Sequence, residues 1–401
     1  MFLGRIDLLQ MNALFTKDEI KKFSAFVLLF TLGQIAVSGL FSLNTFVISR
    51  SDSFFYLTAS ARVSDLTSFE QLYMGYIYLL HVSQFFSDSG TFMVLIQSLF
   101  VILASYALFS ITEQIGSPKA AWISVSFYLL LPMLTQWTRY ILTESIFYAL
   151  IIIGMRLATF RKSNWTRFLL FPVIVLMIFL RPNGIISACA VLTILIILKL
   201  KRNLVSTLLG VLIWCVGIVF SSTLLSSNGT GQETVQSSIF DKTLEGTVVF
   251  GVEELKRKMP PPLTSDRSTG AFIQYISDHP ADNLRLGAHR LFWEFKQVRP
   301  WYSTSLNLFI SFTMFSFYFF SLIGLIRVKN KMIVRAAVVL TLPSALLIAG
   351  TWAIWEGRFA WWVLICWIPF FAVGISDAFE FFLHQIRQLF FYRLNKKYVR
   401  K

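Results

Sequence analysis

The chain has 401 residues, of which 56% are hydrophobic, 16% aromatic and only 14% charged, and its formal net charge is +15. Soluble domains average about 45–50% apolar and about 25% charged residues. A soluble core of this size could not hide 41 Phe and 11 Trp without large exposed apolar patches. The composition therefore predicts an integral membrane protein and excludes the soluble enzyme folds.

Residues 1–22 mix polar and apolar side chains and are predicted to form a cytoplasmic N-terminal segment without a cleavable signal peptide. A polytopic transmembrane domain is predicted over 23–376, and a basic cytoplasmic tail over 377–401. A span needs about 20 mostly apolar residues, so about ten helices are predicted to cross the membrane. The candidate segments are 23–48, 91–112, 120–135, 142–160, 168–181, 183–198, 204–225, 303–326, 333–352 and 359–376. The predicted fold class is an all-α polytopic membrane protein.

Lys and Arg are distributed unevenly between the predicted loops. With the N-terminus inside, the basic excess collects on the inner loops and the tail, whereas the outer segments are nearly neutral. Anionic headgroups attract such an inner face. The positive charge is therefore explained by the membrane, and nucleic-acid binding loses its main support.

Two predicted outer loops, 49–90 and 226–302, are too long to be simple connectors. In the second, 226–270 is predicted to be irregular and to contain Pro260-Pro261-Pro262. A helix is predicted from Pro280, with Asp282 in its first turn. Its predicted apolar face suggests an amphipathic helix on the outer membrane surface, formed by Leu284, Ala288, Leu291, Phe292, Phe295 and Val298. The first loop offers a similar aromatic-rich stretch over 68–86.

Ionisable residues at the predicted span ends converge on the outer face. Burying such charges is costly unless they are paired or used. They come from four separate parts of the chain and are Asp52, Arg139, Glu144, Arg181, Glu356 and Arg358. This one-sided placement is the main functional indication in the sequence.

Each of these residues has a structural and a functional interpretation. Asp52 is either a general base for an incoming hydroxyl or an N-cap for a helix that begins at Ser53. Arg181 and Arg358 suit a lipid phosphate, because guanidinium groups bind phosphate in a fork and stay charged when desolvated. The alternatives are that Arg358 pairs with Glu356, and that Arg181 snorkels or stabilises a helix break at Pro182.

Glu144 is either a helix-start carboxylate or a site residue, and a salt bridge from Arg139 to it is an open alternative. His81 and His289 lie in outer segments, where they could contact substrate or a metal, but a surface or packing role is the main alternative. The three cysteines, Cys189, Cys215 and Cys366, lie in apolar runs and suggest neither a disulfide framework nor a metal site.

Several short motifs, taken in order, resemble the GT-C-fold membrane glycosyltransferases, in the group of protein O-mannosyltransferases and lipid A aminoarabinose transferases. The motifs run from the first outer loop to the last span. They are Asp52-Ser53-Phe54-Phe55-Tyr56-Leu57, Gly75-Tyr76-Ile77, Leu142-Thr143-Glu144-Ser145, Arg181-Pro182-Asn183-Gly184, Asp278-His279-Pro280 and Arg358-Phe359.

The resemblance implies a transferase that uses a polyprenyl-phosphate sugar donor at the outer face of a membrane, here predicted to be the bacterial inner membrane. The acceptor would be a lipid, glycan or protein. The aspartate that serves as base in this group maps onto Asp52, although several members carry Asp-Glu where this chain has Asp52-Ser53. Together with the charged residues above, the predicted substrate-binding residues are Arg139, Glu144, Arg181, Arg358, Tyr76 and His81. A divalent metal stays open.

Two other function classes remain as alternatives. A transporter or lipid flippase is expected to show internal repeats and charges near the bilayer midplane, whereas here the prolines do not match between halves and the charges lie at the rim. A lipid-linked glycan ligase or polymerase at the outer face differs mainly in its donor, which would be a lipid diphosphate oligomer.

Overall fold

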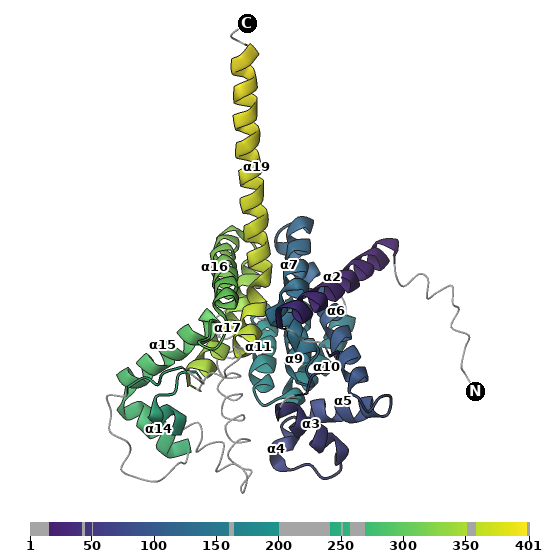
Figure 1. Ribbon diagram of the computed structural model, residues 1–401, viewed down its shortest axis with the longest axis vertical. Coiled ribbons are helices and arrows are strands. Elements are labelled where there is room, and N and C mark those ends of the chain that lie inside the picture. Colours follow the sequence, from purple (N-terminus) through teal and green to yellow (C-terminus); the bar gives the residue numbers. More distant parts are fainter. Residues whose placement is uncertain are drawn as a thin grey trace, which may run out of the picture.

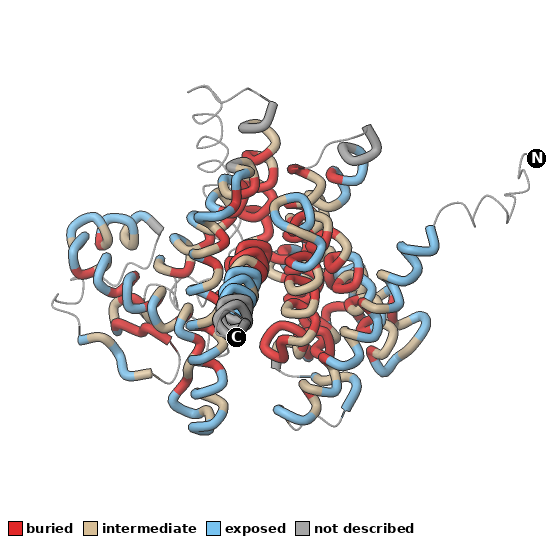
Figure 2. Tube along the Cα trace, turned by 90° about the horizontal axis from the view of Figure 1, so that it is seen from above, coloured by how far each residue is buried: buried red, intermediate tan, exposed pale blue. Residues whose placement is uncertain are grey.

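The computed structural model describes residues 16–41, 45–49, 51–159, 164–199, 241–249, 252–256, 269–350 and 358–398. These residues form a bundle of helices whose buried positions lie along its centre and whose exposed positions face outward (Figure 2). Many of the outward side chains are large and apolar, such as Phe312 and Phe315, which are 74% and 70% exposed. A surface of this kind is suited to lipid, so the architecture agrees with an all-α membrane protein.

The helices of the bundle correspond to the predicted spans that fall in the described ranges. The long helices are α2 (Lys17–Phe41), α6 (Thr91–Ile115), α16 (Thr304–Arg327), α17 (Lys331–Gly350) and α19 (Ile368–Tyr398). The shorter ones are α7 (Pro118–Leu130), α8 (Pro132–Thr135), η1 (Gln136–Thr138), α9 (Glu144–Thr159), α10 (Asn164–Leu180), α11 (Gly184–Lys199), α18 (Arg358–Leu364) and η2 (Ile365–Trp367). Segment 204–225 lies outside the described residues.

Five of the described helical runs are long and apolar enough to cross a membrane, or six if α7 and α8 count as one broken span. The prediction of ten spans is therefore not confirmed. Helices α9 and α11 have 16 residues each, which corresponds to about 24 Å at about 1.5 Å per residue, shorter than a hydrocarbon core of about 30 Å.

The break between α7 and α8 bends the chain by 57°. Leu131 adopts an extended backbone (φ −72°, ψ 110°), and Pro132 begins the next helix. A residue that precedes proline is driven out of the helical region, and proline is well tolerated at the first helical position. The sequence Leu131-Pro132 thus produces the bend that leads the chain toward Arg139 and Glu144.

Helices α16 and α19 pack closely because each contributes a glycine at their contact. A methyl group on Gly324 would lie 1.8 Å from the carbonyl oxygen of Phe370, and one on Gly374 would lie 2.0 Å from that of Phe320. Small residues allow membrane helices to approach each other at this kind of distance. This contact holds the last helix of the chain against the bundle.

The two ends of the bundle differ in structure. Figure 1 shows α19 extending well beyond the bundle at one end, and shorter helices gathered at the other. We call the latter the site end. Its helices are α3 (Ser51–Ala61), α4 (Ser68–Gln71), α5 (Met74–Gln84), α14 (Thr269–Asp278) and α15 (Pro280–Lys296).

Residues that the charge distribution assigns to the inner face meet at the end opposite the site end. Lys119 Nζ lies 3.4 Å from Glu380 Oε1, and Arg327 Nε lies 3.9 Å from Asp377 Oδ2. The predicted tail begins at 377, but α19 continues as one helix to Tyr398. The chain threading inferred from Lys and Arg is consistent with these contacts.

The second outer loop contains more helix than predicted. Residues 241–245 are helical within the stretch predicted to be irregular, and α14 precedes the predicted helix α15. Pro280 begins α15 and Asp282 lies in its first turn, as predicted. The buried face of α15, however, includes Arg290 and Glu294, whereas Leu284 and Phe292 are exposed. The predicted apolar face is thus divided: Leu284 and Phe292 are exposed, whereas Leu291, Phe295 and Val298 pack partly against the core.

Candidate functional site

A β-bridge brings the start of the first outer loop against the segment that leads into α9. Ile48 pairs with Tyr140 in parallel. The Ile48 N–H donates to the Arg139 carbonyl at 2.9 Å, and the Ile141 N–H donates to the Ile48 carbonyl at 3.3 Å. Asp52 and Glu144 each lie four residues after a member of this bridge. Two carboxylates that are distant in the sequence are therefore brought to the same end of the bundle.

Gln97, a fully buried amide on α6, stabilises the segment that leads to Glu144. Its Nε2 donates to the carbonyls of Thr138 at 2.8 Å and Tyr140 at 2.9 Å, and its Oε1 accepts from the Tyr76 hydroxyl at 3.3 Å. Buried backbone carbonyls need hydrogen-bond partners, and this one side chain donates a hydrogen bond to two of them. Gln97 thereby connects α5, α6 and the η1 turn.

Four charged side chains from separate elements form an alternating row, which we call the charge cluster: Asp52, Arg358, Glu144 and Arg181. Arg358 Nη2 donates to Asp52 Oδ2 at 2.8 Å, and Arg358 Nη1 lies 3.4 Å from Glu144 Oε1. Arg181 Nη1 donates to the same Glu144 oxygen at 3.4 Å. Four of the six charges predicted to converge are thus in contact.

Burial changes sharply along the charge cluster. The side chains of Glu144, Arg181 and Arg358 are only 3%, 9% and 13% exposed, whereas that of Asp52 is 44% exposed. Burial alone would lower the pKa of Arg358, but the adjacent carboxylates of Glu144 and Asp52 raise it above its ordinary value. The cluster therefore presents one accessible carboxylate in front of two buried and permanently charged guanidiniums.

Arg181 is positioned by a tight turn between α10 and α11. The Gly184 N–H donates to the Arg181 carbonyl at 2.8 Å, and a side chain at Gly184 would collide with the carbonyl of Met177, 1.7 Å away. The Arg181 guanidinium also lies over the Phe147 ring, 5.2 Å from its centroid. Stacking on an aromatic face is typical of arginines that keep their charge in apolar surroundings.

Two tyrosines of the first outer loop lie beside the charge cluster. Tyr56 follows Asp52 by one helical turn, and its ring is 5.5 Å from that of Tyr73. Burial raises the pKa of Tyr56 well above its ordinary value, with Tyr73 and Glu144 acting in the same direction. Burial likewise raises the pKa of Tyr73. Both phenols therefore stay neutral near pH 7 and retain their O–H donors.

Arg358 is held in place through its backbone and the helix that it begins. The Tyr148 hydroxyl of α9 donates to the Arg358 carbonyl. Two residues later, the Ala360 N–H donates to Glu294 Oε1 of α15 at 3.0 Å. The other carboxylate oxygen of Glu294 accepts from Arg299 Nη2 at 3.1 Å, and both side chains are fully buried. The outer helix α15 is thus connected directly to the start of α18.

The structure shows the surroundings of three further predicted residues. Helix α3 begins at Ser51, so Asp52 lies inside its first turn and does not cap a helix beginning at Ser53. Tyr76 is fully buried and its hydroxyl donates to Gln97, which links α5 to α6. Arg139 directs its Nε and Nη2 to Gln34 of α2, both at 2.7 Å, which places it against α2.

The two predicted histidines of the outer segments have different surroundings. His81 Nδ1 lies 2.8 Å from the Ser60 carbonyl and its ring packs on Phe85, so it joins α5 to α3. His289 is an exposed residue of α15. Glu356, the alternative partner of Arg358, lies outside the described residues.

Sequence reasoning missed three residues that organise the site. Gln97 lies within an apolar run, and a lone amide there is a usable signal because burying it requires hydrogen-bond partners. In the sequence, Glu294 resembles a residue on the solvated face of an amphipathic helix. Arg299 resembles a residue of the segment that follows this helix. Only the structure shows that this polar face is turned inward.

In the described part of the chain, the charge cluster offers two carboxylates to a divalent metal. Hard cations require several oxygen ligands around one point. Within the described ranges, no group of three His, Cys, Asp or Glu side chains could hold a metal ion. The two carboxylates of the cluster alternate with the guanidiniums of Arg358 and Arg181.

Comparison with known proteins adds no assignment. No family model matches the sequence, and no curated protein matches it.

Proposed function

We propose that this protein is a membrane glycosyltransferase that moves a sugar from a polyprenyl-phosphate donor to an acceptor hydroxyl at the outer face of the bacterial inner membrane. The observation that carries the proposal is the charge cluster, in which a half-exposed carboxylate stands in front of buried guanidiniums. A nucleophilic displacement at the anomeric carbon of a sugar needs such an arrangement. The acceptor hydroxyl loses its proton on one side of this carbon, and an anionic phosphate departs on the other.

Asp52 is assigned as the general base. It is the accessible member of the cluster, and an acceptor that approaches from water meets its carboxylate first. The acceptor oxygen loses its proton to Asp52 as it forms a bond to the anomeric carbon, and proton transfer of this kind contributes about 10²–10⁴-fold to rate.

Arg181 and Arg358 are assigned to the departing phosphate. As the bond between the anomeric carbon and the phosphate oxygen breaks, both electrons stay on the phosphate, and the two guanidiniums stabilise that charge. The products are the glycosylated acceptor, polyprenyl phosphate and protonated Asp52. A single displacement inverts the anomeric centre, and apolar surface between the helices accommodates the prenyl chain.

The decisive experiment measures transfer by purified protein. The donors are undecaprenyl-phosphate carrying radiolabelled mannose, glucose or aminoarabinose in turn, and the acceptor is a membrane extract from cells that lack the gene. We expect one donor to yield a new glycosidic product. Asp52→Asn should lower the rate by about 100-fold or more, because the base is lost while the shape of the side chain is kept.

Asp88→Asn is the matched control, because Asp88 is an exposed acid of the same outer loop outside the charge cluster. It should retain wild-type activity. Full activity of Asp52→Asn would remove Asp52 from the mechanism. If labelled lipid crosses reconstituted vesicles while no glycosidic bond forms, the protein is a transporter and the proposal is wrong.

A further inference from the structure

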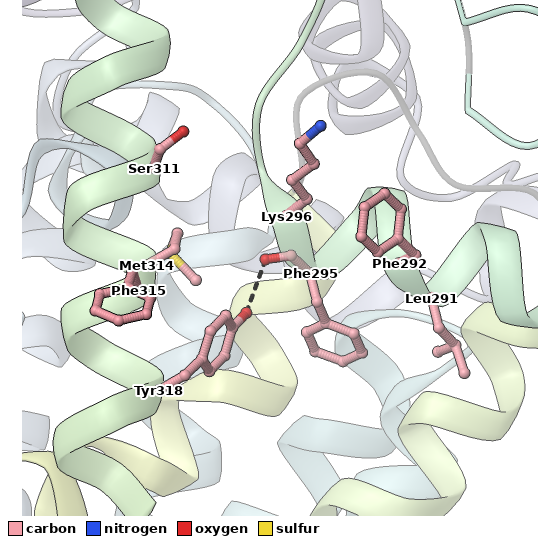
Figure 3. A pocket seen from close by; sticks show the side chains of 8 residues that line it. All are labelled: Leu291, Phe292, Phe295, Lys296, Ser311, Met314, Phe315 and Tyr318. Atoms are coloured by element: carbon pink, nitrogen blue, oxygen red, sulfur yellow. Dashed lines mark hydrogen bonds between the residues drawn. The ribbon is translucent and has the colours of Figure 1, made fainter.

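A groove lies between the outer helix α15 and the membrane helix α16, away from the charge cluster (Figure 3). It encloses about 410 Å³, within the range of about 300–1,000 Å³ in which ligand pockets fall. Its walls are mostly apolar. The residues that line it include Leu291, Phe295, Lys296, Ser311, Phe315 and Tyr318.

The groove is polar at one end and apolar at the other. Figure 3 shows the amine of Lys296 at the end nearest Ser311, whereas Leu291 and Tyr318 lie toward the opposite end. Tyr318 closes its floor by donating to the Phe295 carbonyl at 2.7 Å. Ser311 precedes Tyr318 by two helical turns, so it is nearer the start of α16. This start follows α15 in the chain and lies toward the site end. The cation therefore lies toward the rim of the bundle and the apolar walls lie deeper.

Lys296 supplies the positive charge of the groove. Its ammonium lies over two aromatic rings, 4.7 Å from the Trp293 centroid and 5.5 Å from the Phe292 centroid. In the part of the chain that the structure describes, no carboxylate lies within ion-pair distance of it. An exposed ammonium above apolar walls is complementary to an anion that carries a hydrocarbon chain.

The groove is distinct from the site of the proposed reaction. Glu294, two residues before Lys296, points to the opposite side of α15, where it binds the N–H of Ala360. The body of α15 therefore separates Lys296 from Arg358. A phosphate at Lys296 is not the phosphate that the charge cluster would stabilise.

We propose that this groove binds one membrane phospholipid of net negative charge, with its phosphodiester against Lys296 and an acyl chain between α15 and α16. A phosphodiester carries one negative charge, which a single ammonium balances. The order of the groove, charge at the rim and apolar surface deeper, matches a lipid that lies with its headgroup at the interface. Bound in this way, the lipid fixes α15 on the membrane surface.

The test is native mass spectrometry of the full-length protein in detergent micelles with equal amounts of phosphatidylglycerol and phosphatidylcholine of the same chain length. The wild-type protein should retain one phosphatidylglycerol in preference to phosphatidylcholine. Lys296→Gln should weaken that preference by about five- to tenfold, because one lysine contributes on that order to binding an anionic headgroup. The readout is bound mass, so it is independent of any transferase activity.

Two further variants separate the groove from general surface charge. Arg285→Gln removes an exposed positive charge from α15 outside the groove and should leave the retained lipid unchanged. Ser311→Trp keeps Lys296 but fills the groove, and should abolish retention. The proposal is overturned if Lys296→Gln keeps the preference, if phosphatidylcholine or a polyprenyl phosphate is retained instead, or if the protein is a lipid-free dimer.

Discussion

Glu144 is the residue that balances the buried charge of the site. It lies between Arg181 and Arg358, each with a nitrogen 3.4 Å from its Oε1, and its side chain is only 3% exposed. When one partner of a buried ion pair is removed, the remaining charge is left without compensation in a poorly solvated place. Measured costs of this kind are about 3–5 kcal/mol.

We therefore expect Glu144→Gln to lower the free energy of unfolding by about 3 kcal/mol or more, measured as a large loss of thermal stability in detergent. The double variant Glu144→Gln/Arg181→Met also removes one of the two cations that Glu144 neutralises and should regain part of that loss. If Glu144→Gln is as stable as the wild type, the cluster is not electrostatically coupled as its distances imply.

The sequence identifies the charged residues of the site better than it identifies the residues that hold them in place. Asp52, Glu144, Arg181 and Arg358 are identifiable because ionisable groups at span ends are costly. The contacts between them are not, since each pair depends on elements up to 306 positions apart in the chain. Gln97 and Glu294 are harder still, because their importance lies in which backbone groups they bind.

Among the elements, the contact of α16 with α19 is the most sensitive to side-chain size. A methyl group on Gly324 would lie 1.8 Å from one backbone oxygen and 2.7 Å from its carbon, and neither atom can move without shifting a helix. We expect Gly324→Ala to destabilise the protein by about 1–3 kcal/mol, as overpacked cores do. The measurement is the midpoint of thermal unfolding in detergent.

Gly39→Ala is the matched control for that prediction. Gly39 is also inside a membrane helix, α2, but a methyl group there meets nothing within 4 Å. Because alanine favours helix over glycine by about 1 kcal/mol, this variant should be at least as stable as the wild type. Equal losses in both variants would show that the close approach of α16 and α19 at Gly324 does not decide the result.

Helix α15 shows why periodicity alone misassigns faces in a membrane protein. In a soluble helix the apolar face turns toward the core. Here Leu284 and Phe292 of the predicted apolar face are exposed, and the buried positions of the helix include the charged residues Arg290 and Glu294. The existence and start of the helix follow from the sequence. The direction of its faces requires knowledge of its neighbours.

For the whole molecule, the orientation inferred from Lys and Arg can be tested directly. Cysteine is introduced by Ser89→Cys at the site end or by Lys329→Cys between α16 and α17, after the three native cysteines are replaced. An impermeant maleimide should label Ser89→Cys in intact cells, and Lys329→Cys only after permeabilisation. The opposite pattern would place the charge cluster in the cytoplasm and rule out a reaction at the outer face.

The pairing within the charge cluster has a consequence for how a donor would enter. Arg358 already serves two carboxylates, so an arriving phosphate must compete with them for the same guanidinium. Displacement of Asp52 from Arg358 would free its oxygen at the moment when a proton acceptor is required. In the resting state Asp52 would thus be held by Arg358. Replacement of Asp52 by the donor phosphate as the partner of Arg358 would make the base available only when the leaving group is in place.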